Sequence, residues 1–243
     1  MPSRISLVVP AFDEETVLPR LLDSVDAARA EFGDRDAIET IVADNGSTDR
    51  TAAIAAARGC RVVRIEPRII AAARNGGAAA AGGEILCFTD ADGRIHPGTF
   101  TAIERAMTSG RFVGGATGVV MERRSLGIAA TYVLALPLLW LTGFDTGTVF
   151  CARRDFEAIG GYDETRPYGE DVAFLAALGR HGQRDDRRLV RLRGVKTIAS
   201  TRKFDQHGDW HYFTRMPRLA WRMLARHSAA TDFSRRYWYG SRR

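Results

Sequence analysis

The chain has 243 residues, of which 45% are hydrophobic and 26% are charged. This composition excludes a disordered, collagen-like or coiled-coil protein. The length fits one large α/β domain or two small ones. The net charge of +6 is unevenly distributed, because residues 1–179 sum to −6 and residues 180–243 to +12. A basic end of this kind suits nucleic acid, an anionic membrane or a phosphorylated ligand, or is simply a solvated surface.

The first half of the chain alternates strand and helix patterns. Short apolar runs that end in turn residues predict strands, and apolar residues at helical spacing predict helices between them. The predicted strands are 5–9, 39–43, 60–65 and 84–89, and the predicted helices are 17–32, 49–58 and 69–81, with Ser47 or Thr48 capping the second helix. This alternation predicts a Rossmann-like, doubly wound, mostly parallel sheet with helices on both faces and ligands beyond the carboxyl ends of its strands.

The second half of the chain is less regular. Its predicted elements are helices at 97–108 and 170–180 and strands at 112–120 and 147–152. The 19 residues Leu126–Phe144 carry no charge. They fit a buried segment or an interfacial helix better than a membrane span, because a span would separate the acidic motifs on its two sides.

One acidic motif stands where a predicted strand ends. Asp90-Ala91-Asp92 follows the apolar run 84–89, and carboxylates at i and i+2 of an extended chain point the same way. A divalent cation between this pair and a diphosphate would relieve their repulsion, since Mg²⁺ binds through few carboxylates plus phosphate oxygens. A simple acidic turn is the alternative.

Three further polar clusters suit a ligand site. Asp44, at the end of the second strand, could accept a hydrogen bond from a base N–H, although a turn with a helix cap would use the same residues. Arg74 could bind a phosphate with two hydrogen bonds. Glu170-Asp171 opens a helix behind Gly169, where a carboxylate is either a partner of the helix dipole or a general base for an acceptor hydroxyl.

Taken in chain order, these clusters carry a family resemblance. VVPAFDEE, ADNGSTD, ARNGG, FTDAD, GGYDE and GED closely resemble the motifs of family 2 glycosyltransferases of the GT-A fold, over about residues 5–182. The resemblance implies sugar transfer from a UDP-, GDP- or dTDP-linked sugar to an acceptor hydroxyl or phosphate, usually with inversion and with Mg²⁺ or Mn²⁺. We expect one fused GT-A domain over 1–243, with a donor half at 1–95, an acceptor half at 96–200 and a basic aromatic tail at 201–243.

The resemblance also assigns residues, position by position. The nucleotide-sugar site would comprise Pro10, Ala11, Phe12, Glu14, Asp44, Arg74, Asp90, Ala91 and Asp92. Asn45 stands where the family often has a second aspartate. Asp171 would be the catalytic base, and the acceptor side would comprise Gly161, Tyr162, Asp163 and Glu170. The metal would be held by Asp92, with Asp90 and His207 as further candidates.

Other functions stay open at this point. A nucleotidyltransferase would share the fold and the metal, but it normally has an early glycine-rich loop with a lysine, and this chain has no lysine before Lys196. A non-catalytic sugar-nucleotide-binding protein would not need Asp90, Asp92 and Asp171 together. No nucleic-acid-binding motif is present, so we expect no nucleic-acid partner.

The cellular setting follows from the cysteines and the tail. Three scattered cysteines, Cys60, Cys87 and Cys151, argue against a disulfide framework or a zinc site and favour a reducing cytoplasm. The aromatic and arginine-rich tail fits weak contact with a membrane surface, which would suit a lipid-linked or cell-envelope acceptor. A homodimer is left open.

Overall fold

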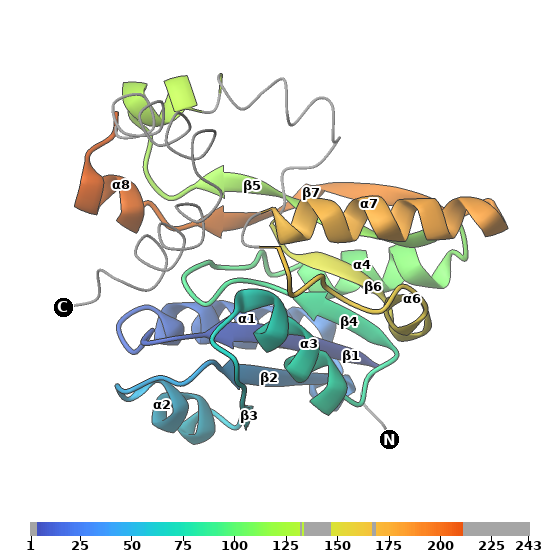
Figure 1. The fold of residues 1–243 in the computed structure, drawn as a ribbon, viewed down its shortest axis with the longest axis horizontal. Coiled ribbons are helices and arrows are strands. Elements are labelled where there is room, and N and C mark those ends of the chain that lie inside the picture. The colour runs from blue at the N-terminus through green and yellow to red at the C-terminus, as the bar shows by residue number, and fades with distance from the viewer. Residues whose placement is uncertain (1–3, 132, 134–146, 167–168, 211–243) are drawn as a thin grey trace. The chain divides into compact units, whose positions relative to one another are not determined.

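The structure is a computed structural model that describes residues 4–131, 133, 147–166 and 169–210 (Figure 1). Contacts between residues divide the chain into two compact units. Unit 1 comprises Met1–Val120 and Phe144–Ala199, and unit 2 comprises Met121–Gly143 and Ser200–Arg243. The predicted nucleotide-sugar and acceptor residues belong to unit 1, and the predicted basic tail belongs to unit 2.

Unit 1 is built on a seven-stranded sheet with the order β3-β2-β1-β4-β6-β5-β7. The strands β1 to β4 pair in parallel, whereas β6 pairs antiparallel with both β4 and β5. Their bounds are β1 Ile5–Ala11, β2 Ile38–Asp44, β3 Arg61–Arg64, β4 Ile85–Phe88, β5 Phe112–Met121, β6 Val149–Ala152 and β7 Arg188–Ala199. Strands of both predicted halves therefore share one sheet, which confirms the predicted fused α/β fold.

Helices cover both faces of this sheet (Figure 1). Because successive side chains of a strand point to opposite faces, Leu7 and Val9 of β1 pack in one apolar cluster and Val8 in another. The first cluster contains α1 (Leu18–Phe32) and α4 (Thr99–Thr108), and the second contains α3 (Ile70–Ala80), α6 (Arg153–Ala158) and α7 (Glu170–Gly182). The remaining helices are α2 (Thr51–Ala57), α8 (Arg202–His207) and the 3-10 turns Arg35–Ala37 and Gln183–Asp185.

The predicted cap of the second helix is wrong. The helix α2 begins at Thr51, and the carboxylate that accepts the Thr51 N–H is that of Asp49, at 2.9 Å. Ser47 and Thr48 instead bind the loop after β1: the Ser47 hydroxyl accepts the N–H of Asp13 at 3.0 Å, and the Thr48 N–H donates to the Asp13 carboxylate at 2.7 Å. These bonds fasten the first two β-to-α loops together.

The apolar run Leu126–Phe144 falls only partly within the structure. Residues 126–131 and 133 are helical, and the rest of the run lies outside the described residues. Among the residues that the structure describes, no helix combines the length and the apolar composition that crossing a bilayer requires.

Candidate active site

The carboxyl ends of three parallel strands meet at one edge of the sheet. Ala11, the last residue of β1, lies opposite Asp44, the last residue of β2. Val8 lies opposite Phe88, the last residue of β4, so Asp90 follows at the same edge. Ligands of open α/β sheets bind beyond these ends, where strand order reverses. The sheet thus places the predicted base-contacting and metal-binding acids on one side of unit 1.

Asp44 and Asn45 are buried in the loop after β2. Asp44 Oδ1 accepts the N–H of Ser47 at 3.0 Å, which fixes the carboxylate. The Asn45 side-chain amide donates to the carbonyls of Ile65 and Pro67, each at 3.0 Å. Asn45, the departure from the family pattern, therefore fastens the chain that follows β3, a task that an aspartate could not perform because a carboxylate has no N–H.

Phe12 lies beside this loop and stacks under an arginine that the sequence did not indicate. The Arg68 guanidinium carbon lies 4.3 Å from the centroid of the Phe12 ring, and Arg68 also donates to the Gly46 carbonyl at 3.3 Å. An arginine two residues before a helix belongs to no motif, so no sequence signal marks it. The other predicted residues of this segment, Pro10, Ala11 and Glu14, are buried.

Arg74, on α3, connects the two halves of the site. Its side chain is only 3% exposed. It contacts three carboxylates: Asp90 at 3.0 Å, Glu170 at 2.8 Å and Asp171 at 3.1 Å. Glu170 follows Arg74 by 96 positions in the sequence, so this one guanidinium joins the end of β4 to the start of α7. We expected Arg74 to face a phosphate, and in the structure it faces acids.

The carboxyl group of Asp171 has a raised pKa. Burial raises the pKa of its carboxyl group to about 6, the charges of Glu170 and Asp90 add to that rise, and the Arg74 guanidinium opposes it. Its Oδ1 atom is buried and has no hydrogen-bond partner among the described residues. A carboxylate with a raised pKa and a free oxygen suits the task of taking a proton near neutral pH.

Tyr162 forms the floor of the Arg74 cluster. Its ring lies 5.1 Å below the Arg74 guanidinium and stacks on Phe174 at a centroid distance of 4.3 Å. Burial raises the pKa of its hydroxyl well above the usual value. Tyr162 is 2% exposed, so it supports the cluster from within the core.

Asn75, the residue after Arg74, holds the loop that carries Tyr162. Its side chain accepts the Tyr162 N–H at 2.8 Å and donates to the Tyr162 carbonyl at 2.9 Å. The position before Tyr162 requires a glycine. The φ angle of Gly161 is +73°, which other residues rarely adopt, and a Cβ on Gly161 would lie only 2.6 Å from Asn75 Oδ1. Sequence reasoning placed Asn75 in a motif but assigned it no role.

The remaining predicted residues are dispersed. Asp163 is exposed and accepts hydrogen bonds from Thr165 and from Arg166, which hold the pKa of its carboxyl group below the usual value. Ala91 is buried and Asp92 half-buried. His207 lies in α8 of unit 2, and its side chain is outside the described part of the structure, so its role as a metal ligand stays a prediction.

A network of hydrogen bonds between buried threonine hydroxyl groups surrounds the end of β4. Thr89, directly before Asp90, accepts a hydrogen bond from Thr148 at 3.4 Å. The hydroxyl of Thr148 contacts that of Thr197 at 3.1 Å, and Thr197 contacts Thr117 at 2.9 Å. All four threonines are buried. Thr117 lies in β5 and Thr197 in β7, whereas Thr89 directly follows β4 and Thr148 directly precedes β6. The network fixes the point at which the acidic motif leaves the sheet.

The donor set of this motif suits a hard divalent cation. Asp90 and Asp92 offer carboxylate oxygens, the ligands that Mg²⁺ and Mn²⁺ prefer, and the Asp90 side chain is 60% exposed. Within the described residues no cluster of three or more histidine, cysteine or acidic side chains is arranged to hold a metal. Mg²⁺ commonly completes its coordination with phosphate oxygens and water.

Comparison with solved structures identifies the fold. TarS of S. aureus, in complex with UDP-GlcNAc, matches with a TM-score of 0.63 and 17% identity over 82% of this chain and 58% of its own. The mannosyltransferase PcManGT of Pyrobaculum calidifontis, with GDP-Man and Mn²⁺, matches with a TM-score of 0.62 and 20% identity over 81% and 56%. Glucosyl-3-phosphoglycerate synthase of Mycobacterium tuberculosis, with Mn²⁺, UDP and glucosyl-3-phosphoglycerate, matches with a TM-score of 0.58 and 23% identity over 85% and 75%.

Comparison of sequences identifies the family. Two curated proteins, each described as an uncharacterized glycosyltransferase, come from Mycobacterium tuberculosis and Mycobacterium bovis and are 33% identical to this chain over 107 residues. That alignment covers 44% of this chain and 44% of each relative, so the chain matches less than half of their length. Residues 6–154, more than half of the chain, match the family described as glycosyl transferase family 2. The chain therefore belongs to glycosyl transferase family 2, and its sheet and helices form the GT-A fold.

Proposed function

We propose that this chain transfers a sugar from a nucleotide-diphosphate sugar to a hydroxyl or phosphate of an acceptor, with inversion and with Asp171 as the general base. One observation carries the proposal: a single buried arginine contacts both Asp90, of the motif that suits a metal diphosphate, and Asp171, the acid with a raised pKa. The residues proposed for donor binding and for the general base are thus adjacent in unit 1.

The nucleoside would bind at the loop after β2. Asp44 is fixed through Oδ1, and its carboxylate would accept a hydrogen bond from a base N–H. The exposed Arg68 guanidinium, which stacks on the Phe12 ring, offers a flat surface beside it, and a flat cation of this kind stacks on bases. The bound UDP-GlcNAc and GDP-Man of two structural relatives support a nucleotide-sugar donor.

The diphosphate would bind beside Asp90 and Asp92. These carboxylates would hold Mg²⁺ or Mn²⁺, which when bound would neutralise the negative charge that develops on the leaving nucleoside diphosphate. The Mn²⁺ of two structural relatives supports this choice of metals. Arg74 holds Asp90 in place from the buried side, at 3.0 Å.

Asp171 would act on the acceptor. When its carboxylate is ionised, it accepts the acceptor hydroxyl proton while the hydroxyl oxygen attacks the anomeric carbon from the face opposite the diphosphate. The new glycosidic bond forms as the bond to the diphosphate breaks, so the anomeric configuration inverts. Arg74 keeps the carboxylate oriented at 3.1 Å, the Tyr162 ring packs against the guanidinium, and Glu170 binds the other guanidinium nitrogen.

Direct assay of donors tests this function. The full chain would be incubated with UDP-, GDP- and dTDP-linked sugars in the presence of Mn²⁺, and released nucleoside diphosphate would be measured. We expect one donor to be hydrolysed slowly, and the release to require both Mn²⁺ and Asp92. Release of pyrophosphate from a nucleoside triphosphate and a sugar phosphate, with no hydrolysis of any sugar nucleotide, would instead identify a nucleotidyltransferase.

A further inference from the structure

Three large hydrophobic side chains of the described residues are exposed, and all three belong to unit 2. Leu126 is 83% exposed, Val133 is 64% exposed and Trp210 is 51% exposed. Exposing apolar side chains of this size to water has a free-energy cost, and grouped exposure is typical of a surface that meets another apolar phase.

The local geometry places these side chains near one another. Leu126 and Val133 belong to the helical residues 126–131 and 133 and are seven positions apart, which is close to two turns, so they share one face. Gly127 touches the other segment of unit 2, because a Cβ on Gly127 would lie 2.7 Å from the backbone carbonyl oxygen of Asp209. Trp210 directly follows Asp209, so its backbone lies beside the start of the helix that carries Leu126.

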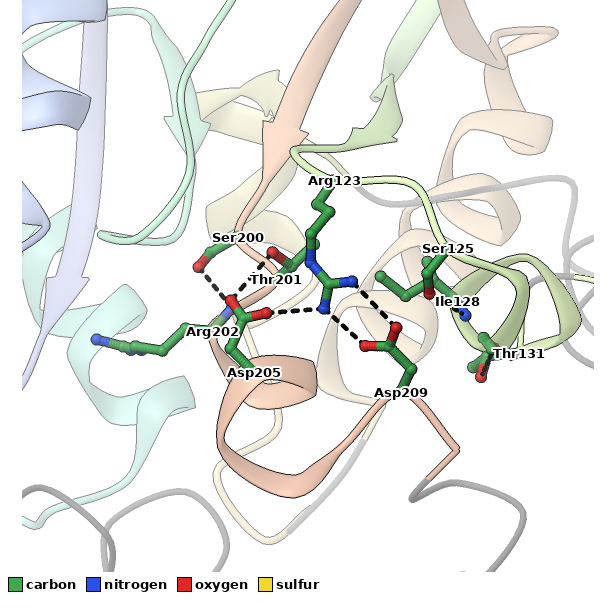
Figure 2. A network of polar contacts seen from close by, with 10 residues as sticks. Arg123, Ser125, Ile128, Thr131, Ser200, Thr201, Arg202, Asp205 and Asp209 are labelled. Atoms are coloured by element: carbon green, nitrogen blue, oxygen red, sulfur yellow. Dashed lines mark hydrogen bonds and ion pairs between the residues drawn. The ribbon is translucent and has the colours of Figure 1, made fainter.

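An ion-pair network fastens these two segments (Figure 2). The Arg123 guanidinium donates to both carboxylate oxygens of Asp209, at 3.0 and 2.6 Å, and to Asp205 at 2.7 Å. Two parallel N–H···O bonds make a geometrically specific arginine–carboxylate contact. The contact joins the segment that precedes Leu126 to the segment that precedes Trp210.

The charge of the two units is opposite in sign. From the sequence, unit 2 carries a net charge of +8 and unit 1 a net charge of −2. Exposed Arg124 stands two positions before Leu126, so a cation that has no ion pair among the described residues adjoins the apolar face. Apolar anchors beside arginines are the composition of elements that lie on an anionic bilayer, where the anchors enter the headgroup boundary and the cations bind lipid phosphates.

We propose that unit 2 docks on the surface of an anionic lipid bilayer, with Leu126, Val133 and Trp210 inserted and Arg124 against the headgroups. This partner extends the proposed function, because it would bring the chain to the membrane in which lipid-linked acceptors lie. The docking itself requires no catalysis, so it can fail or succeed independently of the proposed transferase activity.

Vesicle sedimentation of the full chain tests the docking. Wild-type protein should bind vesicles of phosphatidylglycerol and phosphatidylcholine at about 0.05 M salt, should bind weakly at about 0.5 M salt, and should not bind pure phosphatidylcholine. The triple variant Leu126→Ser, Val133→Ser, Trp210→Ser should partition about tenfold less or lower still. Arg124→Glu should also reduce binding at low salt.

Arg64→Glu is the matched control, because Arg64 is exposed on β3 of unit 1 and the charge change is the same as in Arg124→Glu. It should reduce binding less than Arg124→Glu does, since Arg64 belongs to unit 1 and not to the proposed docking surface. Thermal unfolding checks that every variant folds.

The proposal is overturned if wild type fails to bind at low salt, if the triple variant binds like wild type, or if Arg64→Glu loses as much binding as Arg124→Glu. A wild-type dimer that the triple variant dissociates, with unchanged vesicle binding, would instead show that the apolar face is covered by a second copy.

Discussion

At the scale of single residues, the site depends on one arginine that serves three acids. Asp90, Glu170 and Asp171 all lie within 3.1 Å of the Arg74 guanidinium nitrogens. Arginine suits this position because its planar fork donates several hydrogen bonds at once and stays charged when buried. The sequence identified all four residues, but it could not show that the arginine faces carboxylates, because their partners are distant in the chain.

Replacing Asp171 by asparagine should abolish most of the turnover. The amide keeps the shape of the side chain but cannot take a proton, so kcat should fall by about 10²–10⁴-fold while the Kd of the donor changes little. Asp23→Asn is the control, since Asp23 is exposed on α1 and belongs to no part of the predicted site. Steady-state kinetics with donor titration measures both quantities. A variant that keeps more than a few per cent of the wild-type rate would move the base to Glu170.

Turnover should depend on pH through the same group. Because the pKa of Asp171 is raised to about 6, the carboxyl group becomes protonated, and inactive as a base, as the pH falls through that value. The rate should therefore decline below about pH 6 and stay level above it. The free energy of unfolding should change with pH in the opposite direction, because a raised pKa means that folding favours the protonated form of Asp171. The stabilisation from this group is fully present below pH 3.8, its pKa in the unfolded chain, and is lost as the pH rises through about 6. A kcat profile that stays flat down to pH 5 would contradict the assignment.

At the scale of elements, the site depends on how helices and loops are fastened to the sheet. Elements with pure apolar patterns, such as Ile5–Ala11, match their predictions closely. The strand β7 and the helix α6 are among the elements that were missed. The strand β7, Arg188–Ala199, carries basic residues on its exposed positions, so its period of two is hidden in a charged run. The helix α6 has only six residues and starts directly after β6, which leaves no room for a start signal.

A pair of neighbouring glycines tests the link between α3 and the Tyr162 loop. Gly160 and Gly161 both have positive φ, but a Cβ on Gly160 meets nothing within 4 Å, whereas one on Gly161 meets Asn75 and Phe156. Gly160→Ala should therefore cost only the backbone strain, about 1–3 kcal/mol. Gly161→Ala should cost more and should also lower kcat, because it displaces Tyr162 beneath Arg74. Thermal unfolding and kinetics measure the two effects, and equal loss in both variants would show that the contact with Asn75 is unimportant.

At the scale of the whole molecule, one mixed sheet brings together motifs from both halves of the chain. The order of β1, β2 and β4 follows from alternating strands and helices, so the sequence predicted the edge where Asp44 and Asp90 lie. The antiparallel β6 between β4 and β5 was not predictable, because no local pattern states which strand inserts beside which. For the same reason the contacts of Thr148 and Arg68 had no sequence signal.

Donor and metal together should stabilise the folded chain. A ligand that binds only the folded state at 100 times its Kd adds about 2.7 kcal/mol, which for a protein of this size raises Tm by about 5–10 °C. We expect this rise with UDP or GDP in the presence of Mn²⁺, and only a small one without the metal, because the carboxylates of Asp90 and Asp92 would repel a bare diphosphate. Asp92→Ala should remove the part of the Tm rise that depends on Mn²⁺. Glu31→Ala, which replaces an exposed acid on α1, should not.

Differential scanning fluorimetry measures these changes in Tm, with a single-stranded oligonucleotide as the control for general binding of phosphate by a basic chain. An equal shift with the oligonucleotide, or an undiminished Mn²⁺-dependent shift in Asp92→Ala, would show that the ligand is held by the basic surface rather than by the acids at the end of β4.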